Sequence, residues 1–276
     1  MNYVKLLFML LASSLYGQQP IAELPKELVE SSALAYLNKE FYSINDSGNE
    51  PKIYVFNDKG GIQHTCFIEN VSNVDWEALC FDEKYIYIGD IGNNLNKRKD
   101  LGIYRVEREK VRAFNSVEAE IIRFQYHGQQ DFPPEQNDLY YDAESLVMRN
   151  DSLFIFTKNR TEPFDGIAKV YYVPSNFGSQ VEAKALYLYD LNLPATNWME
   201  ESITDAQVCG DHLFILTYAK VYDFKWIGNQ FVEQETYDFD SFTQKEGLAI
   251  SKRFIYLTEE KEAITAKINK LYKLKR

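Results

Sequence analysis

Short apolar runs separated by polar residues dominate this 276-residue chain, and their spacing repeats along it. Runs of this kind, rich in Ile, Val, Phe and Tyr, are typical of half-buried β-strands. The repeat is clearest where a Leu stands eleven residues before the polar residue that ends the next strand: Leu34 and Asn45, Leu79 and Asp90, and Leu146 and Thr157. Two further copies end their second strands at Thr217 and Thr258. The pattern therefore predicts a repeated β-strand unit with five copies.

Each copy continues through a loop to a third strand that carries an apolar residue followed by Tyr: Ile53-Tyr54, Ile103-Tyr104, Val170-Tyr171, Val221-Tyr222 and Leu271-Tyr272. A fourth strand follows the first four copies, in residues 64–70, 119–126, 184–191 and 230–239. One four-stranded meander cannot cover both of its own faces, whereas several arranged around an axis can. The sequence therefore predicts an all-β fold, a β-propeller of four-stranded blades.

Five blades is the number that the copies support. Two longer stretches, 107–141 and 174–203, leave a sixth blade as an alternative, and a pair of β-sandwich domains is the alternative fold. The fifth copy ends after its third strand, so we predict that residues 20–30 supply the missing outer strand and close the ring. The C-terminal tail has a helix-forming composition, but its Leu271-Tyr272 pair matches the repeat, and we predict a strand there.

The first residues have the pattern of a cleaved signal peptide. Lys5 precedes an apolar run, Leu6 to Leu11, that is too short to span a bilayer, so a membrane anchor is the lesser alternative. We therefore expect a signal peptide in residues 1–18, a single propeller domain in residues 19–276, no membrane span, and a secreted or periplasmic location.

Charge and the metal-binding residue types exclude several classes of function. The net charge of -11 becomes -12 when Lys5 is removed with the signal peptide, and an acidic protein repels nucleic acid, so no nucleic-acid partner is expected. The three cysteines contain no C-x-x-C motif, and the three histidines are scattered over unrelated parts of the repeat. Neither a zinc site nor a Ser-His-Asp triad is therefore indicated.

The start of the first strand and the end of the second strand share one face of a propeller meander, and both are polar in this chain. We expect them to converge around one mouth of the central channel. The candidate metal ligands at the strand starts are Asp75, Glu77, Asp142, Glu144, Asp205 and Glu246. The candidate ligand-binding residues are Asp46, Trp76, Asp90, Asn93, Lys158 and Arg160.

Crowded carboxylates repel one another, by about 4 kcal/mol per pair at 4 Å for an effective dielectric near 20, and they need protons, basic partners or a cation. Oxygen ligands of irregular geometry favour Ca²⁺ over Mg²⁺. The alternative is that each acid caps the backbone of a blade.

Several single residues also have two interpretations. Trp76 is either a stacking platform or core between blades. Lys158 and Arg160 either contact a ligand or neutralise the acids, and residues 97–99 are interpreted as a solvated loop. The glycines of DSGN and DIGNN are predicted to take positive φ.

Six motifs in order carry a resemblance over nearly the whole mature chain: NDSGN at Asn45, NVDWEAL at Asn73, GDIGNN at Gly89, DAESL at Asp142, TDAQV at Thr204 and EGLAI at Glu246. They resemble a family of secreted bacterial β-propeller proteins whose members mostly have no assigned function, and are distantly similar to SdiA-regulated and phytase-like propellers. The resemblance implies a periplasmic or extracellular propeller associated with calcium. TDAQV departs from the usual Glu, which removes one ligand from a full ring.

These observations support three hypotheses for the function. The first is a monomeric propeller that binds a small molecule or a protein at the channel mouth, with Ca²⁺ in or near it. The second is a metal-dependent hydrolase of phosphate esters or lactones, in which an ion held by Asp75, Glu77, Asp142 or Glu144 activates water. The third is a pure interaction scaffold in which all the acids are structural.

Overall fold

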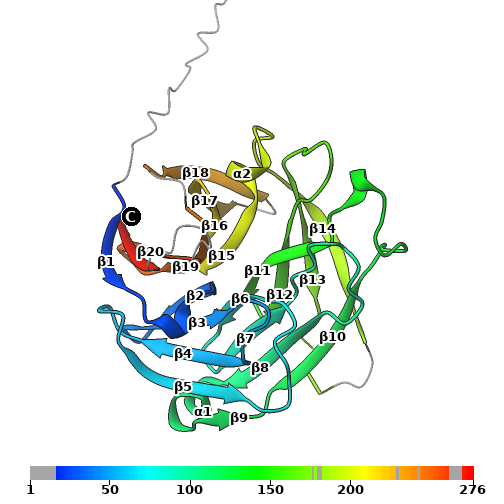
Figure 1. Ribbon diagram of the computed structural model, residues 1–276. Helices are drawn as coiled ribbons and strands as arrows, with labels where there is room; N and C mark the ends of the chain where they lie inside the picture. Colours follow the sequence, from blue (N-terminus) through cyan, green and yellow to red (C-terminus); the bar gives the residue numbers. More distant parts are fainter. Residues whose placement is uncertain (1–16, 176, 179–181, 228–229, 241–242, 261–268) are drawn as a thin grey trace, which may run out of the picture.

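A computed structural model describes residues 17–175, 177–178, 182–227, 230–240, 243–260 and 269–276. In this part of the chain the protein is a β-propeller of five four-stranded antiparallel blades, as the repeat predicts (Figure 1). Most of the predicted signal peptide and the helix-forming stretch 261–268 lie outside the described residues.

The blades follow one another along the chain, and the strands of blades 1 to 4 run in chain order from the axis outward. Blade 1 contains β2 (Ser31–Leu37), β3 (Glu40–Asn45), β4 (Lys52–Phe56) and β5 (Ile62–Ile68). Blade 2 contains β6 (Trp76–Phe81), β7 (Tyr85–Asp90), β8 (Gly102–Glu107) and β10 (Glu120–Tyr126). Blade 3 contains β11 (Asp142–Arg149), β12 (Ser152–Lys158), β13 (Ile167–Val173) and β14 (Ala183–Asn192). Blade 4 contains β15 (Ile203–Cys209), β16 (His212–Thr217), β17 (Lys220–Ile227) and β18 (Gln230–Asp238).

Blade 5 is completed by the N-terminus. Its three inner strands are β19 (Lys245–Ile250), β20 (Phe254–Glu259) and β21 (Lys270–Lys275), and its outer strand is β1 (Gln19–Glu23), which pairs antiparallel with β21. The Asn269 side chain then donates hydrogen bonds of 2.9 and 2.7 Å to the carbonyls of Leu28 and Val29. Closure of the ring by the N-terminal segment and the strand character of the C-terminal tail are both confirmed.

The innermost strands form the centre of the molecule. β2, β6, β11, β15 and β19 contact one another in ring order, and β19 contacts β2 again (Figure 1). The central residues of these strands are buried. Each inner strand contacts the second strand of its own blade and the inner strands of the two neighbouring blades. Separate hydrophobic clusters fill the spaces between adjacent blades, which is how the repeat buries the faces that one meander leaves open.

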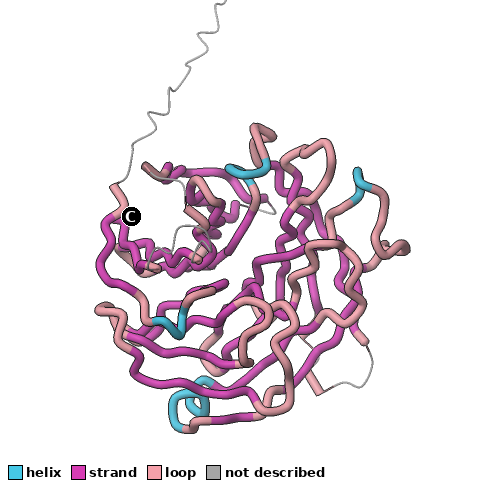
Figure 2. Tube along the Cα trace, viewed as in Figure 1, coloured by secondary structure: helices cyan, strands magenta, loops and turns pink. Residues whose placement is uncertain are grey.

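In the described residues, the two long stretches that left room for a sixth blade contain the outer strands β10 and β14 together with short elements. The first contains α1 (Arg108–Ala113), β9 (Ser116–Val117) and η2 (Gln136–Asp138), and the second contains α2 (Trp198–Glu201). A further turn of helix, η1 (Lys26–Leu28), lies between β1 and blade 1. Helix is thus confined to short pieces between strands (Figure 2). Within the described ranges, none of these helices has the length and apolar character needed to cross a bilayer.

Candidate functional site

The first strand of every blade carries a register shift at the same position, close to its start. The pairing with the second strand skips one residue in each blade: Ser32, Glu77, Glu144, Thr204 and Glu246. A β-bulge of this kind re-aims the side chain of the skipped residue. The five bulged residues therefore occupy equivalent places around one end of the channel, which we call the channel mouth.

The chemistry of the bulged residue differs between blades. The Ser32 hydroxyl donates a 2.6 Å hydrogen bond to the carbonyl of Trp76 in blade 2, and the Thr204 hydroxyl donates a 2.7 Å bond to the carbonyl of Lys245 in blade 5. These two residues join neighbouring blades. The other three positions hold Glu, so carboxylates lie where the hydroxyls of blades 1 and 4 form structural bonds.

Three carboxylates from two blades meet at the mouth. Asp46 follows β3, Asp75 immediately precedes β6, and Glu77 is the bulged residue of β6. One oxygen from each side chain lies within 4.8 Å of the oxygens of the other two. We call these three residues the acidic cluster. The sequence predicts Asp46 as a ligand-binding residue, and the structure places it with two of the predicted metal ligands.

Burial and mutual repulsion make ionisation of the acidic cluster unfavourable. Burial, followed by the charges of Asp46 and Asp142, raises the pKa of Asp75 to about 7. The pKa of Glu77 is raised well above its usual range, first by burial and then by the charge of Glu144. Within the described ranges, no group donates a hydrogen bond to the Glu77 carboxylate, although this residue is only 5% exposed. Glu77 therefore lacks the partners that buried carboxylates normally have, whereas Asp46 accepts a hydrogen bond from the backbone N–H of Ser47.

A glycine provides the space that these carboxylates occupy. A Cβ added at Gly92 would lie 2.5 Å from Cγ of Asp75 and 2.8 Å from Cγ of Glu77. Gly48 has a φ of +80°, as predicted for a turn, but Gly92 lies outside the left-handed region. The prediction of positive φ is wrong for Gly92, because this glycine is required for close approach of the acids and not for a turn.

The other side of the mouth carries a chain of hydrogen bonds across three blades. Lys158 Nζ donates a 2.6 Å bond to Glu144 and a 2.9 Å bond to the hydroxyl of Tyr218. The Tyr218 hydroxyl in turn donates to Glu246 at 3.2 Å. Burial lowers the pKa of Lys158, but the charge of Glu144 and the other groups nearby raise it by more, so the lysine is charged. Lys158 thus neutralises Glu144, one of the two roles that the sequence allowed.

Arg160 and Asp142 join blades 2 and 3. Arg160 Nε donates a 2.7 Å hydrogen bond to one oxygen of Asp142, and the Asn93 backbone N–H donates a 2.7 Å bond to the other. The Arg160 guanidinium also lies 5.1 Å from the ring centroid of Trp198, which begins α2. Both oxygens of Asp142 are therefore occupied by protein donors, as the capping interpretation expects.

Asp90 is also fully buried and satisfied. One of its oxygens accepts 2.8 Å from Arg98 Nη2, and the other accepts 2.6 Å from the hydroxyl of Tyr104. The interpretation of residues 97–99 as a solvated loop is wrong for Arg98, because its side chain is only 15% exposed and pairs with Asp90. The contact could not be predicted from the repeat, because Arg98 lies in a long loop that the other copies do not share.

Asp205 is fully buried and bonded to backbone. It follows the bulged residue of β15, and its oxygens accept 2.7 Å hydrogen bonds from the backbone N–H of Leu248 and from the next residue in the chain. Gln207, two residues further on, donates its side-chain amide to the carbonyls of Leu34 and Leu79 at 3.2 and 3.0 Å. Side chains of blade 4 therefore bridge the inner strands below the mouth, and Asp205 caps backbone there.

The indole of Trp76 belongs to the core. This residue is fully buried, and its ring lies 5.9 Å from that of Tyr104. The structure thus agrees with the core interpretation. Two other aromatic residues lie beside Lys158 at the mouth instead: Tyr218, which follows the second strand of the fourth copy, and Trp198, which the repeat does not single out. Glu260, which follows β20, joins the acidic side, and burial raises its pKa to about 6.

Comparison with known proteins supports the fold. No family model matches the sequence, and no curated protein matches it either. The chain is similar in structure to glutaminyl cyclase of Myxococcus xanthus, with 10% identity, 95% of this chain and 97% of that chain covered, and a TM-score of 0.54. A luciferin-regenerating enzyme aligns over 93% of this chain and 95% of that chain, with 9% identity and a TM-score of 0.49. At 10% identity, the likeness to glutaminyl cyclase shows the propeller fold alone.

Proposed function

We propose that the channel mouth binds a calcium ion through Asp46, Asp75 and Glu77, and that the occupied mouth binds a small molecule or a protein. One observation carries the proposal: the carboxylate oxygens of Asp46, Asp75 and Glu77, from two blades, lie within 4.8 Å of one another. Glu77 is nearly buried, and among the described residues no group donates a hydrogen bond to its carboxylate. Carboxylates at this separation need protons or a cation. Gly92 leaves the space in which their oxygens gather.

The distribution of basic groups supports a cation at the acidic cluster. Three other acids of the mouth have basic partners: Asp90 with Arg98, Asp142 with Arg160, and Glu144 with Lys158. Within the described ranges, no Lys or Arg forms an ion pair with Asp46, Asp75 or Glu77. An all-oxygen set of irregular geometry favours calcium over magnesium.

The surroundings of the acidic cluster support a ligand that contacts the ion. A bound calcium ion would supply positive charge and coordination positions for ligand oxygens. Trp198 lies at the rim beside Arg160 and offers a flat, half-buried indole to a ligand. All the proposed ligands of the ion come from the mouth of one chain, and no residue of a second copy is needed. The proposed functional unit is therefore a monomer. A secreted or periplasmic location would provide the calcium.

Calcium titration of the purified protein tests the proposal. After treatment with EDTA, the full mature chain is expected to take up one calcium ion per molecule in isothermal titration calorimetry. Glu77→Gln removes one ligand charge while keeping the side-chain shape, and is expected to weaken binding by at least about tenfold. Glu118→Gln is the matched control, since Glu118 is exposed and far along the chain from the mouth residues. Absence of calcium-dependent heat, or equal affinity of the two variants, would contradict the proposal.

A second candidate is a metal-dependent hydrolase of phosphate esters or lactones. The buried hydrogen-bond chain from Glu144 through Lys158 and Tyr218 to Glu246 favours it, because such a chain can hold a proton beside the acidic cluster. Turnover of a panel of phosphate esters and lactones with added calcium, lost in Glu144→Gln, would support this candidate. Background rates throughout would leave a binding protein, or a scaffold if calcium does not bind either.

Secretion is tested separately. N-terminal sequencing of the protein recovered from outside the cytoplasm is expected to begin near residue 19, at the start of β1. A chain that retains Lys5 would contradict cleavage of a signal peptide.

A further inference from the structure

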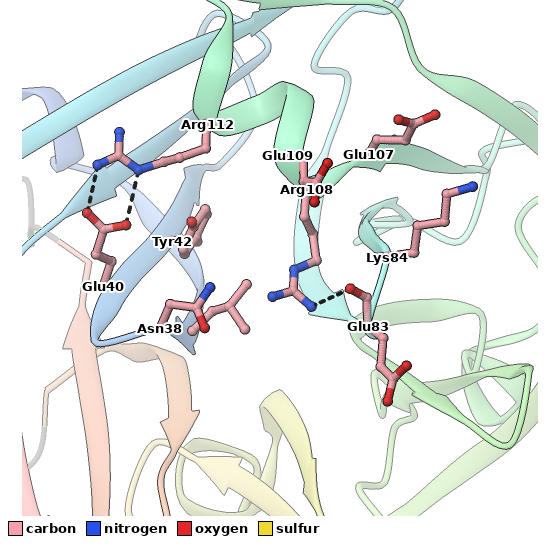
Figure 3. Close-up of a pocket in the computed structure, with 10 residues that line it drawn as sticks. Asn38, Glu40, Tyr42, Glu83, Lys84, Glu107, Arg108, Glu109 and Arg112 are labelled. Atoms are coloured by element: carbon pink, nitrogen blue, oxygen red, sulfur yellow. Dashed lines mark hydrogen bonds and ion pairs between the residues drawn. The ribbon is translucent and has the colours of Figure 1, made fainter.

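A pocket of about 600 Å³ lies between blades 1 and 2 (Figure 3). It is at the end of the inner strands opposite the channel mouth, because the turns that follow β2 and β6 line it. The turns that join β2 to β3 and β6 to β7 form two of its sides, and α1 forms a third. Its volume is within the range of small-molecule sites. Its lining residues are Leu37, Asn38, Glu40, Tyr42, Glu83, Lys84, Glu107, Arg108, Glu109 and Arg112.

A short helical crossing places two arginines over this pocket. α1 leaves the end of β8 in blade 2, and the chain then forms β9, which pairs parallel with β5 of blade 1. Val111 is fully buried and anchors α1. Arg108 and Arg112 are four residues apart and so share the face of α1 that covers the pocket.

The two arginines have different partners. Arg112 donates hydrogen bonds of 3.1 and 2.8 Å to the two oxygens of Glu40, so this pair is neutral. Arg108 donates from Nη1 alone, to the backbone carbonyls of Asp82 and Glu83 at 2.6 and 2.8 Å. Neither carbonyl carries a charge, and among the described residues no carboxylate pairs with Arg108. Its guanidinium projects into the middle of the pocket, while the Glu83 carboxylate turns away from it (Figure 3).

A buried tyrosine adds a second observation. Tyr42 on β3 is only 5% exposed and lines the pocket. In the part of the chain that the structure describes, no group forms a hydrogen bond with its hydroxyl, which is left for water or a ligand in the pocket. The Tyr42 hydroxyl and a guanidinium with free N–H groups thus line the same space. A guanidinium can only donate hydrogen bonds and a phenolic hydroxyl can also donate one, so an acceptor group satisfies both.

The charges of the lining limit what that acceptor is. Glu107 pairs with Lys110 at 3.2 Å, which leaves Arg108 and Lys84 against Glu83 and Glu109. Because these four charges cancel, the net charge of the lining does not select the ligand. Recognition depends on the free edge of the Arg108 guanidinium, and one carboxylate can accept from two N–H groups of such an edge. The side chain of Leu37 and the ring of Tyr42 provide an apolar wall.

We propose that this pocket is a second binding site, independent of the channel mouth, for a small organic monocarboxylate with an apolar body. Arg108 and the Tyr42 hydroxyl hold the carboxylate, and Leu37 contacts the body. The site is distinct from the proposed calcium site because the two lie at opposite ends of the inner strands.

Titration calorimetry with 3-phenylpropionate as the probe tests the site in the full mature chain. We expect a dissociation constant on the order of 1 mM or tighter, with 3-phenylpropionamide at least about tenfold weaker and phenyl phosphate no tighter than the carboxylate. Tyr42→Phe removes an unpartnered hydroxyl and is expected to weaken the probe by about threefold to tenfold without lowering the melting temperature. Tyr54→Phe, which changes a buried tyrosine of the same blade outside the pocket, is expected to change neither quantity.

Three results would overturn the proposal. These are no binding of 3-phenylpropionate in the millimolar range, equal binding of the acid and its amide, and equal affinity of Tyr42→Phe and the wild type. Glu77→Gln separates this site from the mouth, since it is expected to leave binding of 3-phenylpropionate unchanged whether or not the mouth binds calcium. Loss of probe binding in Glu77→Gln would place the probe at the mouth and contradict the second site.

Discussion

Lys158 and Glu144 form an ion pair of 2.6 Å in which the two side chains are only 3% and 5% exposed. The lysine comes from the end of β12 and the glutamate from the bulge of β11, so the pair closes one blade at the channel mouth. Tyr218 and Glu246 extend it into blades 4 and 5. The pair therefore neutralises one bulged glutamate, while Glu77, at the equivalent position of blade 2, has no such partner among the described residues.

Removal of the lysine is expected to destabilise the protein strongly. Lys158→Met leaves the Glu144 charge buried without a partner, and the free energy of unfolding should fall by about 3–5 kcal/mol. Lys169→Met is the control, because that lysine pairs with Asp138 at 3.6 Å near the surface and should change stability by less than about 1 kcal/mol. Urea unfolding measures both. Similar small losses in the two variants would show that the buried pair is not important for stability.

The stability of the calcium-free protein is expected to fall as pH rises from about 4 to about 7. The Asp75 carboxyl has a pKa of 3.8 when unfolded and about 7 when folded, so the folded state binds more protons in this interval. Calcium requires the ionised form, so the gain in melting temperature on adding calcium should instead increase with pH through about 7. Melting curves at several pH values, with calcium or EDTA, measure both trends. Asp75→Asn should flatten the calcium-free trend, and an unchanged slope would contradict the assignment.

Gly92→Ala is expected to damage the acidic cluster. The new Cβ would lie 2.5 Å from Cγ of Asp75, so the carboxylates must move, at a loss of about 1–3 kcal/mol in stability and with weaker calcium binding. Gly48→Ala is the matched control: its Cβ meets no atom within 4 Å, and the cost of about 1–2 kcal/mol comes from a φ of +80°. Its calcium affinity should be unchanged. Equal calcium affinity in both variants, measured by titration calorimetry, would contradict the role of Gly92.

Deletion of the N-terminal strand is expected to open the ring. A chain that begins at Leu24 lacks β1 and exposes the edge of β21, with its unpaired backbone groups. We expect a lower free energy of unfolding and concentration-dependent association, measured by urea unfolding and light scattering. A chain that begins at Gln18 retains β1 and should behave as the full mature protein does. Equal stability of the two chains would show that ring closure contributes little.

The architecture is readable from the sequence because each blade must bury the same strand positions. The constant separation of Leu34 from Asn45 and of Leu79 from Asp90 follows from two strands and one tight turn of fixed length. The last copy lacks an outer strand, which would leave the edge of its third strand unpaired. Because an unpaired strand edge is unfavourable, the sequence predicts that the N-terminus closes the ring. These features depend on local spacing and on the periodicity of burial.

The composition of the candidate site is only partly readable, since the repeat predicts which chain ends meet but not where each carboxylate points. Asp205 lies one residue beyond the bulge and caps backbone, whereas Glu77 lies on the bulge and faces the acidic cluster. Arg98 and Trp198 come from stretches without a repeat, where spacing carries no information. One-residue shifts and non-repeated loops thus separate the structural acids from the candidate ligands.

A crystal structure of the protein grown with calcium tests the proposed calcium site most directly. We expect one anomalous difference peak at the channel mouth, with oxygens of Asp46, Asp75 and Glu77 at about 2.3–2.6 Å from it. A mouth without such a peak at saturating calcium, with oxygens of the three carboxylates still within 4.8 Å of one another, would contradict the site.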